Sequence, residues 1–490
     1  MGVAANTLYA FAQLGLTRFA SVATLIALAW MQGPAAVGVF SLALTFHILL
    51  TGWWVGIDDK IIREIARSRA GERDDAATSA STRAATWQMV SAYLRLKVLV
   101  TAALCLAVIG IIFWGGWYTP DQSWFIALLL VSSISDNGIF GILAAYAGHE
   151  RFSVALVIIS LQTLLRLLLT GLALWRGTDL LAIAGGWLVA SLLTALFALL
   201  LFVLHFYDRR AQAELPQRHW SSIVRPREDW SFVSMGIVVI LEYQLDIILL
   251  SFFRSPAEVG YYSFATTLFS LATLPAQAFR TAIYPAMSRL AALNGPTELS
   301  PNPGSGHNLQ RIYAWSLAGI GSVAIPSALL GLFFAQPLIA LAVGPKMAAA
   351  VLPTQILMAA VVLLSLNVPH SRFLLATNQQ EKAALFITIS AVVNVLANLW
   401  LGRLWGAPGA AIARSISTLT FLLLAGFSVR RFVRLPGWRL SVTPLGAGLV
   451  MAGFLLLTSG WLWWLSAVVA LLLYAGVWWW LSGLTQMRTA

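Results

Sequence analysis

The stretch Gly33-Pro-Ala-Ala-Val-Gly-Val-Phe-Ser-Leu-Ala-Leu-Thr45 occurs a second time, in altered form, as Ser255-Pro-Ala-Glu-Val-Gly-Tyr-Tyr-Ser-Phe-Ala-Thr-Thr267. The two copies are 222 residues apart and share proline, glycine, serine and threonine at matching positions, which chance rarely achieves in an apolar chain. In each copy a proline-containing turn precedes a long apolar run. Internal repeats of this kind are common in transporters, so the stretch predicts two lobes of one design.

The composition is that of a membrane protein. Hydrophobic residues make up 59% of the 490 positions, charged residues make up 10%, and the mean hydropathy is +0.81. A soluble domain carries about 25% charged and about 45–50% apolar residues. The single cysteine, Cys105, excludes an intramolecular disulfide and a cysteine metal cluster.

Fourteen apolar segments are long enough, at about 20 residues each, to cross a bilayer. They lie near 8–31, 36–57, 90–114, 123–147, 153–174, 180–204, 230–253, 259–284, 312–334, 350–370, 383–401, 406–428, 443–459 and 461–482. We therefore predict an all-α integral membrane protein with two pseudo-symmetric six-helix lobes and two further C-terminal helices. The predicted parts are an N-lobe (1–204), a cytoplasmic linker (205–229), a C-lobe (230–428) and a C-terminal helix pair (429–490).

The distribution of lysine and arginine predicts the orientation. With the N-terminus inside, the cytoplasmic connections and the C-terminal tail hold 21 of these residues, and the opposite connections hold 4. The positive-inside rule therefore predicts that both termini are cytoplasmic. This asymmetry also explains the net charge of +12 without a nucleic-acid partner. The connection 58–86 balances its bases with acids, which predicts a solvated amphipathic helix.

Several motifs carry a resemblance to a known family. The repeat stretch at Gly33, followed by Gly56-Ile-Asp and Ile62-Arg-Glu-Ile-Ala-Arg67, resembles the opening of the polysaccharide-transporter branch of the multidrug/oligosaccharidyl-lipid/polysaccharide exporter superfamily. Tyr284-Pro-Ala-Met-Ser-Arg-Leu290 and Gly406-Ala-Pro-Gly-Ala-Ala-Ile-Ala413 resemble the second lobe of the same family. The resemblance covers about residues 1–430.

This resemblance implies a V-shaped pair of six-helix bundles around a central cavity lined mainly by spans one, two, seven and eight. It implies a flippase of the O-antigen repeat-unit type in a bacterial cytoplasmic (inner) membrane. Such a protein moves polyprenyl-diphosphate-linked sugars to the outer leaflet by alternating access. Membrane lipids and proteins of polysaccharide polymerisation or export are the expected partners. Neither a cofactor nor a catalytic signature is expected.

Arginines inside the predicted spans are the first candidate site residues, because ionisable groups in a membrane are costly and usually functional. Arg18 lies near the middle of span one, and Arg280 lies toward the cytoplasmic end of span eight. If the family architecture holds, both helices line the cavity. A guanidinium grips phosphate oxygens in bidentate fashion, so we predict that Arg18 and Arg280 bind the substrate diphosphate. Alternatively, either arginine closes an ion pair between helices.

Two acids in span seven are candidates for ion coupling. Glu242 and Asp246 are four residues apart and therefore share one helix face. Two carboxylates that face one cavity repel each other, which favours binding of a proton or sodium ion. Alternatively, these acids neutralise Arg18 or Arg280 when the cavity is empty.

Three more arginines are candidates for the substrate cavity, and each has a structural alternative. Arg95 lies with Lys97 near the cytoplasmic end of span three, where snorkelling to the interface would explain both. Arg166 shares a helix face with Gln162, and Asp136 of span four is its expected structural partner. Arg414 has no obvious partner in the sequence.

The remaining polar groups predict no further chemistry. Asn394 and Asn398 are stacked on one helix face, where hydrogen bonds between helices are the expected role. The histidines are scattered, so no metal site is predicted, and no glycine-rich loop precedes a Lys-Ser or Lys-Thr pair.

Two other functions remain open. A drug or cation antiporter of the same superfamily is expected to line its cavity with acids rather than arginines. A membrane glycan polymerase or ligase is expected to place arginines and a long loop outside the cytoplasm. Here the connections on that side are short and hold only 4 basic residues, which argues against the enzyme.

Overall fold

The computed structural model describes residues 3–70, 76–177, 179–208, 240–242, 244–294, 307–430, 438–458 and 462–487. Every regular element within these ranges is a helix, which confirms the predicted all-α fold. The chain divides into two compact units, Met1–Gln244 (unit 1) and Leu245–Ala490 (unit 2), and each is described here by itself. The predicted linker lies outside the described residues except for 205–208, so its boundaries stay a prediction.

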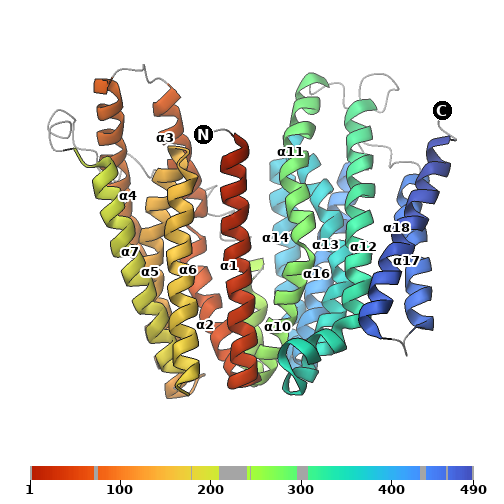
Figure 1. Ribbon diagram of the computed structural model, residues 1–490, viewed down its shortest axis with the longest axis horizontal. Coiled ribbons are helices and arrows are strands. Elements are labelled where there is room, and N and C mark those ends of the chain that lie inside the picture. Colours follow the sequence, from red (N-terminus) through yellow and green to blue (C-terminus); the bar gives the residue numbers. More distant parts are fainter. Residues whose placement is uncertain are drawn as a thin grey trace. The chain divides into compact units, whose positions relative to one another are not determined.

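Unit 1 is a helical bundle built around one central helix (Figure 1). Its central helix α5 packs against α2, α3, α4, α6 and α7, while α1 packs mainly on α6. The core includes the fully buried side chains of Tyr93, Tyr146 and Phe202. The helices are α1 (Val3–Met31), α2 (Pro34–Gly52), α3 (Val55–Ala70), α4 (Ala76–Gly115), α5 (Pro120–Gly148), α6 (Phe152–Trp175) and α7 (Leu180–Phe206).

Unit 2 also has a central helix, α13, which packs against α10, α11, α12, α14 and α16. The two C-terminal helices α17 and α18 pack on each other and on α12. After a helix at Gln244–Phe253, the elements are α10 (Pro256–Ala272), α11 (Leu274–Asn294), α12 (His307–Val343), η2 (Pro345–Ala350), α13 (Val351–Ala376), α14 (Gln380–Ala397), η3 (Asn398–Gly402), α15 (Arg403–Trp405), α16 (Ala407–Val429), α17 (Trp438–Leu457) and α18 (Trp463–Met487).

The repeated stretch begins one helix in each unit. Pro34 is the first residue of α2, after Gly33 with φ 88°, a conformation that favours glycine. Pro256 is the first residue of α10, where the Ser255 hydroxyl accepts a hydrogen bond from the Glu258 amide. Both helices end early, and α3 and α11 begin within three residues of their ends. The single continuous helices predicted for 36–57 and 259–284 are therefore wrong.

The second copy of the repeat also anchors the start of α16. The Glu258 carboxylate accepts a hydrogen bond from the Ala407 amide at 3.3 Å, and Arg254 donates from Nη2 to the Arg403 carbonyl at 2.7 Å. Gly406 has φ 62°, and a Cβ at this position would lie 1.6 Å from Glu258 Oε2. Only glycine therefore fits where these two segments meet.

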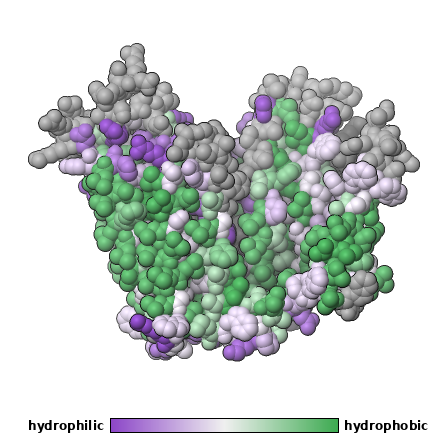
Figure 2. Space-filling model, in the orientation of Figure 1, coloured by the Kyte–Doolittle hydropathy of each residue, from purple (hydrophilic) through white to green (hydrophobic). Residues whose placement is uncertain are grey.

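Ten helices among the described residues are long and apolar enough to cross a membrane, and three shorter apolar helices accompany them. The protein is therefore a multi-pass membrane protein. The visible face of each unit carries a broad hydrophobic zone with hydrophilic residues at either end (Figure 2). Two helices extend well beyond the spans predicted at 90–114 and 312–334: α4 has 40 residues and α12 has 37. At 1.5 Å per residue a 40-residue helix is roughly 60 Å long, about twice the hydrocarbon thickness.

The predicted solvated helix at 58–86 is only partly correct. Residues up to Ala70 form α3, whereas 76–86 belong to α4, and 71–75 lie outside the described residues. Helix α3 is amphipathic, but its apolar face is buried: Ile57, Ile61 and Ile65, four residues apart, are at most 5% exposed.

Candidate functional site

A buried ion pair joins four helices of unit 1. The Asp136 carboxylate on α5 accepts hydrogen bonds from Arg166 Nη2 and, at 2.7 Å, from Gln162 Nε2, both on α6. His47 Nε2 of α2 lies 2.9 Å from the same carboxylate. Arg166 also donates to Ser191 Oγ on α7 at 2.7 Å. The predicted Asp136–Arg166 pair is thus confirmed, with His47 as a partner that the sequence did not indicate.

Unit 2 contains a similar cluster around Asp246. Arg414 Nη1 of α16 donates to Asp246 Oδ2 at 3.0 Å, and the Tyr262 hydroxyl of α10 donates to the same oxygen at 2.7 Å. Asn394 and Asn398 both donate from Nδ2 to Asp246 Oδ1. The interpretation that Arg414 lacks a partner was therefore wrong. The two asparagines do join helices by hydrogen bonds, as predicted, but they do so through a carboxylate.

Both clusters bury their carboxylates. The Asp136 side chain is 2% exposed and the Asp246 side chain is 1% exposed, and each carboxylate faces a guanidinium. Removing one partner of such a pair is strongly destabilising, since the other charge stays buried and unpaired. We therefore interpret Arg166 and Arg414 as structural in this conformation, and their predicted contact with substrate stays a prediction.

A third buried pair connects α3 to α4. Lys97 Nζ donates to both oxygens of Asp58 at 2.8 Å, and the Tyr93 hydroxyl donates to Asp58 Oδ1 at 2.7 Å. The Lys97 side chain is 0% exposed, and its ammonium lies 5.9 Å from the centre of the Trp54 ring. The snorkelling interpretation is therefore wrong for Lys97. The acid that pairs with it lies 39 residues earlier, so spacing along one helix could not have indicated it.

Asp58 and its neighbour Asp59 also line a cavity of about 450 Å³ in unit 1. Asp59 is exposed, but partial desolvation of its carboxyl, reinforced by the negative charge of Asp58, raises its pKa, while Arg63 acts in the opposite direction. Apart from these acids the walls are mainly apolar, and they include Ile62, Phe140, Leu143 and Phe152.

The predicted diphosphate ligands, Arg18 and Arg280, differ in exposure from the arginines that pair with acids. Arg18 on α1 and Arg280 on α11 are both exposed. In the part of the chain that the structure describes, no acidic side chain lies within 4.0 Å of either guanidinium. Arg95 on α4 is exposed too, and its Nε donates to the Ser91 carbonyl one turn earlier at 3.3 Å. Arg18 and Arg280 lie in different units, so each is described only within its own unit.

The predicted coupling pair is only partly placed. Asp246 is buried in the Arg414 cluster of unit 2, whereas Glu242 belongs to unit 1 and is half-buried. The expectation that Asp246 neutralises Arg18 or Arg280 does not match its observed partner, Arg414. A role for Glu242 and Asp246 in ion binding stays a prediction.

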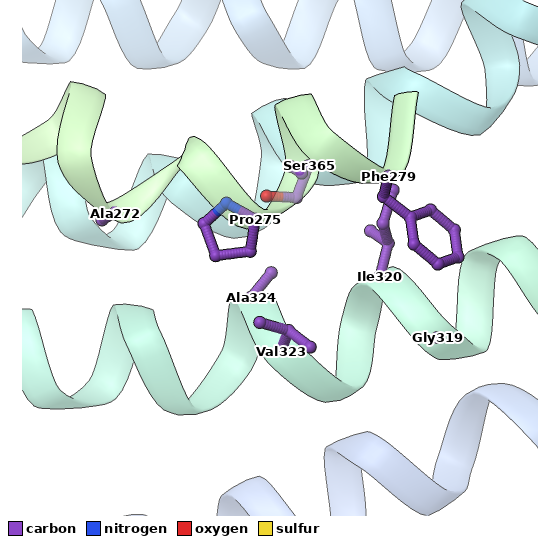
Figure 3. Close-up of a pocket in the computed structure, with 9 residues that line it drawn as sticks. Ala272, Pro275, Phe279, Gly319, Ile320, Val323, Ala324 and Ser365 are labelled. Carbon is purple, nitrogen blue, oxygen red and sulfur yellow. The ribbon is translucent and has the colours of Figure 1, made fainter. Parts of the chain in front are cut away.

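The crevice shown in Figure 3 does not offer a ligand site of useful size. It lies in unit 2 between α11 and α12, and its volume is about 30 Å³, enough for only one or two water molecules. Its walls are apolar apart from Ser365. Among the described residues, no group of three histidine, cysteine or acidic side chains could hold a metal ion.

Three comparisons place the chain among known proteins. Two solved structures share its fold: the inward closed conformation of the lipid II flippase MurJ and an inward-facing multidrug resistance MATE family transporter of the MOP superfamily. The first has a TM-score of 0.71 and 15% identity, with 99% of both chains covered. The second has a TM-score of 0.66 and 13% identity, with 84% of this chain and 94% of that chain covered. At these identities the likeness concerns the fold alone.

The sequence matches are more direct. The "probable low-salt glycan biosynthesis flippase Agl15" of Haloferax volcanii is 25% identical over 215 residues, and the match spans 43% of each chain. The family model described as "polysaccharide biosynthesis protein" matches residues 3–291, more than half of this chain. The chain therefore belongs to the polysaccharide biosynthesis protein family.

Proposed function

We propose that this protein is a flippase for polyprenyl-diphosphate-linked oligosaccharide or polysaccharide repeat units. It moves them from the cytoplasmic to the outer leaflet by alternating access and catalyses no covalent reaction. The family and the glycan flippase relative support the cargo class, and the fold is shared with a lipid II flippase. The excess of 21 over 4 basic residues supports cytoplasmic termini. We place the protein in a bacterial inner membrane, beside proteins that polymerise or export the glycan.

One contrast among the arginines carries the proposal. Arg166 and Arg414 have acids as partners, whereas Arg18 and Arg280 are exposed and have no acidic partner within the described ranges. Arg18 lies in the short apolar helix Gly15–Met31, where an unpaired cation is costly unless water or an anionic ligand reaches it. A diphosphate supplies that anion, and a guanidinium binds it with two parallel hydrogen bonds.

The proposal is tested by transport in reconstituted vesicles that carry a fluorescent polyprenyl-diphosphate sugar. Arg18→Gln and Arg280→Gln are each expected to slow flipping by about 10- to 100-fold, the loss of one or two charge-assisted hydrogen bonds. Lysine at either position is expected to restore part of the rate, since it carries the positive charge but cannot form the two parallel hydrogen bonds of a guanidinium. The matched control is Arg176→Gln, an exposed arginine directly after α6. Parent-like rates in both variants, at equal protein abundance, would remove these arginines from the site.

Coupling to an ion gradient is proposed for Glu242 and Asp246. A coupling cation that binds Asp246 would have to compete with Arg414, whose Nη1 lies 3.0 Å from the carboxylate. The double variant Glu242→Gln, Asp246→Asn is expected to lose any dependence of flipping on imposed pH, sodium or potential gradients. Unchanged gradient dependence in that variant would place the coupling elsewhere.

A cation antiporter is the second candidate, and the cavity in unit 1 favours it. Two acids, Asp58 and Asp59, lie at an apolar cavity of about 450 Å³. Asp58, however, already binds Lys97 through both oxygens, which leaves Asp59 as the acid available to a cationic drug. Proton-driven efflux of a hydrophobic cation, abolished by Asp59→Asn, would favour the antiporter.

A further inference from the structure

One face of α11 carries polar groups that the proposed site does not yet use. Arg280, Tyr284 and Ser288 follow one another at intervals of four residues, so they form a stripe along the helix. The stripe faces α13, because the guanidinium carbon of Arg372 on that helix lies 5.5 Å from the centre of the Tyr284 ring. Helices α11 and α13 pack directly on each other.

The polar atoms along this contact are unusually short of partners. Arg372 Nε and Ser288 Oγ are both buried, and within the described part of unit 2 neither has a hydrogen-bond partner. Buried donors of this kind are rare, because each one that is left unpaired costs free energy. A ligand that accepts a hydrogen bond at Arg372 would supply the partner that its Nε lacks.

The charges point to the sign of that ligand. Arg280 lies one helical turn before Tyr284 on the same face of α11, so its positive charge is on the side of the helix that contacts Arg372. Across the described ranges, no carboxylate lies within 4.0 Å of either group. Two cations that are held together without an acid favour an anion with several oxygens.

We infer that Arg372 joins Arg280 in one anion site of unit 2, in which the two guanidinium groups grip the two phosphates of a diphosphate. The Tyr284 ring holds the Arg372 guanidinium in place by a cation–π contact, which makes Tyr284 a positioning residue. The inference rests on the proposed function and adds to it a further phosphate ligand, Arg372 on α13, beside Arg280.

The test uses the full-length protein in detergent and geranylgeranyl diphosphate as the probe, with binding measured by titration calorimetry. Arg372→Gln is expected to weaken binding by about 10- to 100-fold, and Arg372→Lys by less. Geranylgeranyl monophosphate is expected to lose less affinity than the diphosphate on Arg372→Gln, because one guanidinium suffices for one phosphate. The matched control is Arg430→Gln, since Arg430 also lies over a ring, that of Phe427, at 5.8 Å.

The outcomes separate the two proposals. If Arg280→Gln weakens binding and Arg372→Gln does not, the inference is wrong and the proposed function stands. If the parent protein binds no diphosphate, both are overturned. If phosphatidylglycerol displaces the diphosphate at comparable concentration, the site takes lipid headgroups and the assignment to cargo is wrong. Tyr284→Leu gives an independent check that keeps both arginines, and parent-like affinity in this variant would refute the positioning role.

Discussion

Replacing Arg166 by methionine tests whether the Asp136 cluster holds unit 1 together. Methionine fills much of the same space with an uncharged side chain, but it leaves the Asp136 carboxylate without its guanidinium. Breaking a buried pair costs about 3–5 kcal/mol. His47, 2.9 Å from the carboxylate, and Gln162, at 2.7 Å, would remain as partners. We therefore expect the lower value, about 3 kcal/mol.

Replacing the acid of the same ion pair should reduce the free energy of unfolding by less. Asp136→Asn leaves Arg166 charged, but the Arg166 side chain is 18% exposed, against 2% for Asp136. Arg166 would also keep its bond to Ser191 and its place over the Trp187 ring, 4.4 Å from the ring centre. We expect about 1.5–2 kcal/mol for Asp136→Asn, the lower part of the range for one lost charge-assisted hydrogen bond. The double variant should be more stable than the sum of the two losses predicts.

The assay exploits the single cysteine. Cys105 lies on α4 in the same unit and is 1% exposed, so a thiol-reactive dye labels it only when unit 1 opens. Arg166→Met should lower the labelling midpoint temperature by roughly 6–12 °C, from about 2–4 °C per kcal/mol in a unit of this size. Arg95→Met, which removes an exposed arginine bonded only to its own helix, is the control. Equal, additive shifts for Arg166→Met and Asp136→Asn would refute the reasoning.

Three further predictions concern stability. Lys97→Met should destabilise unit 1 by about 3–5 kcal/mol, because Asp58 stays behind without its cation, and Cys105 labelling should report the loss. Gly406→Ala should reduce the melting temperature more than Gly116→Ala: both have φ 62°, but only Gly406 has atoms of another side chain in the way. Partial desolvation raises the pKa of the exposed Asp59 carboxyl in the folded protein, so its ionisation weakly opposes folding once the pH rises above the ordinary pKa of an aspartate. Asp59→Asn should therefore raise the melting temperature at pH 7.5, and this gain should shrink towards pH 4.

Composition and the positions of prolines and glycines were enough to predict most of the helices. A stretch of about 20 apolar residues has few alternatives to a membrane helix, and Pro34 and Pro256 mark helix starts because proline fits the first turn. Breaks inside an apolar run were missed. The junction at Thr273 between α10 and α11 carries no charge or glycine, but Pro275 lies in the first turn of α11 and could have marked it. The prediction passed over this proline because the residues around it are apolar.

Pairing between charges was predictable only where the spacing was favourable. Asp136 and Arg166 lie on predicted spans four and five, which neighbour each other in sequence, so their pairing could be expected. Asp246 and Arg414 are 168 residues apart and lie on spans seven and twelve. No periodicity connects such positions, and only the fold of unit 2 brings them together. The assignment of Asp246 to an open ion site therefore overlooked a cation already beside it.

The acids in the membrane helices divide the arginines into two classes. A buried carboxylate in a low-dielectric environment requires a cation at close range, so Asp136 and Asp246 each hold one arginine within a lobe. An arginine that is engaged in this way has little charge left for a mobile phosphate. Arg280 has no such acid among the described residues, and we propose that it shares a diphosphate site with Arg372. In that proposed site the two like charges repel each other until a dianion arrives, so binding energy would be gained when the cargo enters and lost when it leaves. A transporter needs a site of this kind, because a site satisfied by its own carboxylates would have no reason to bind cargo.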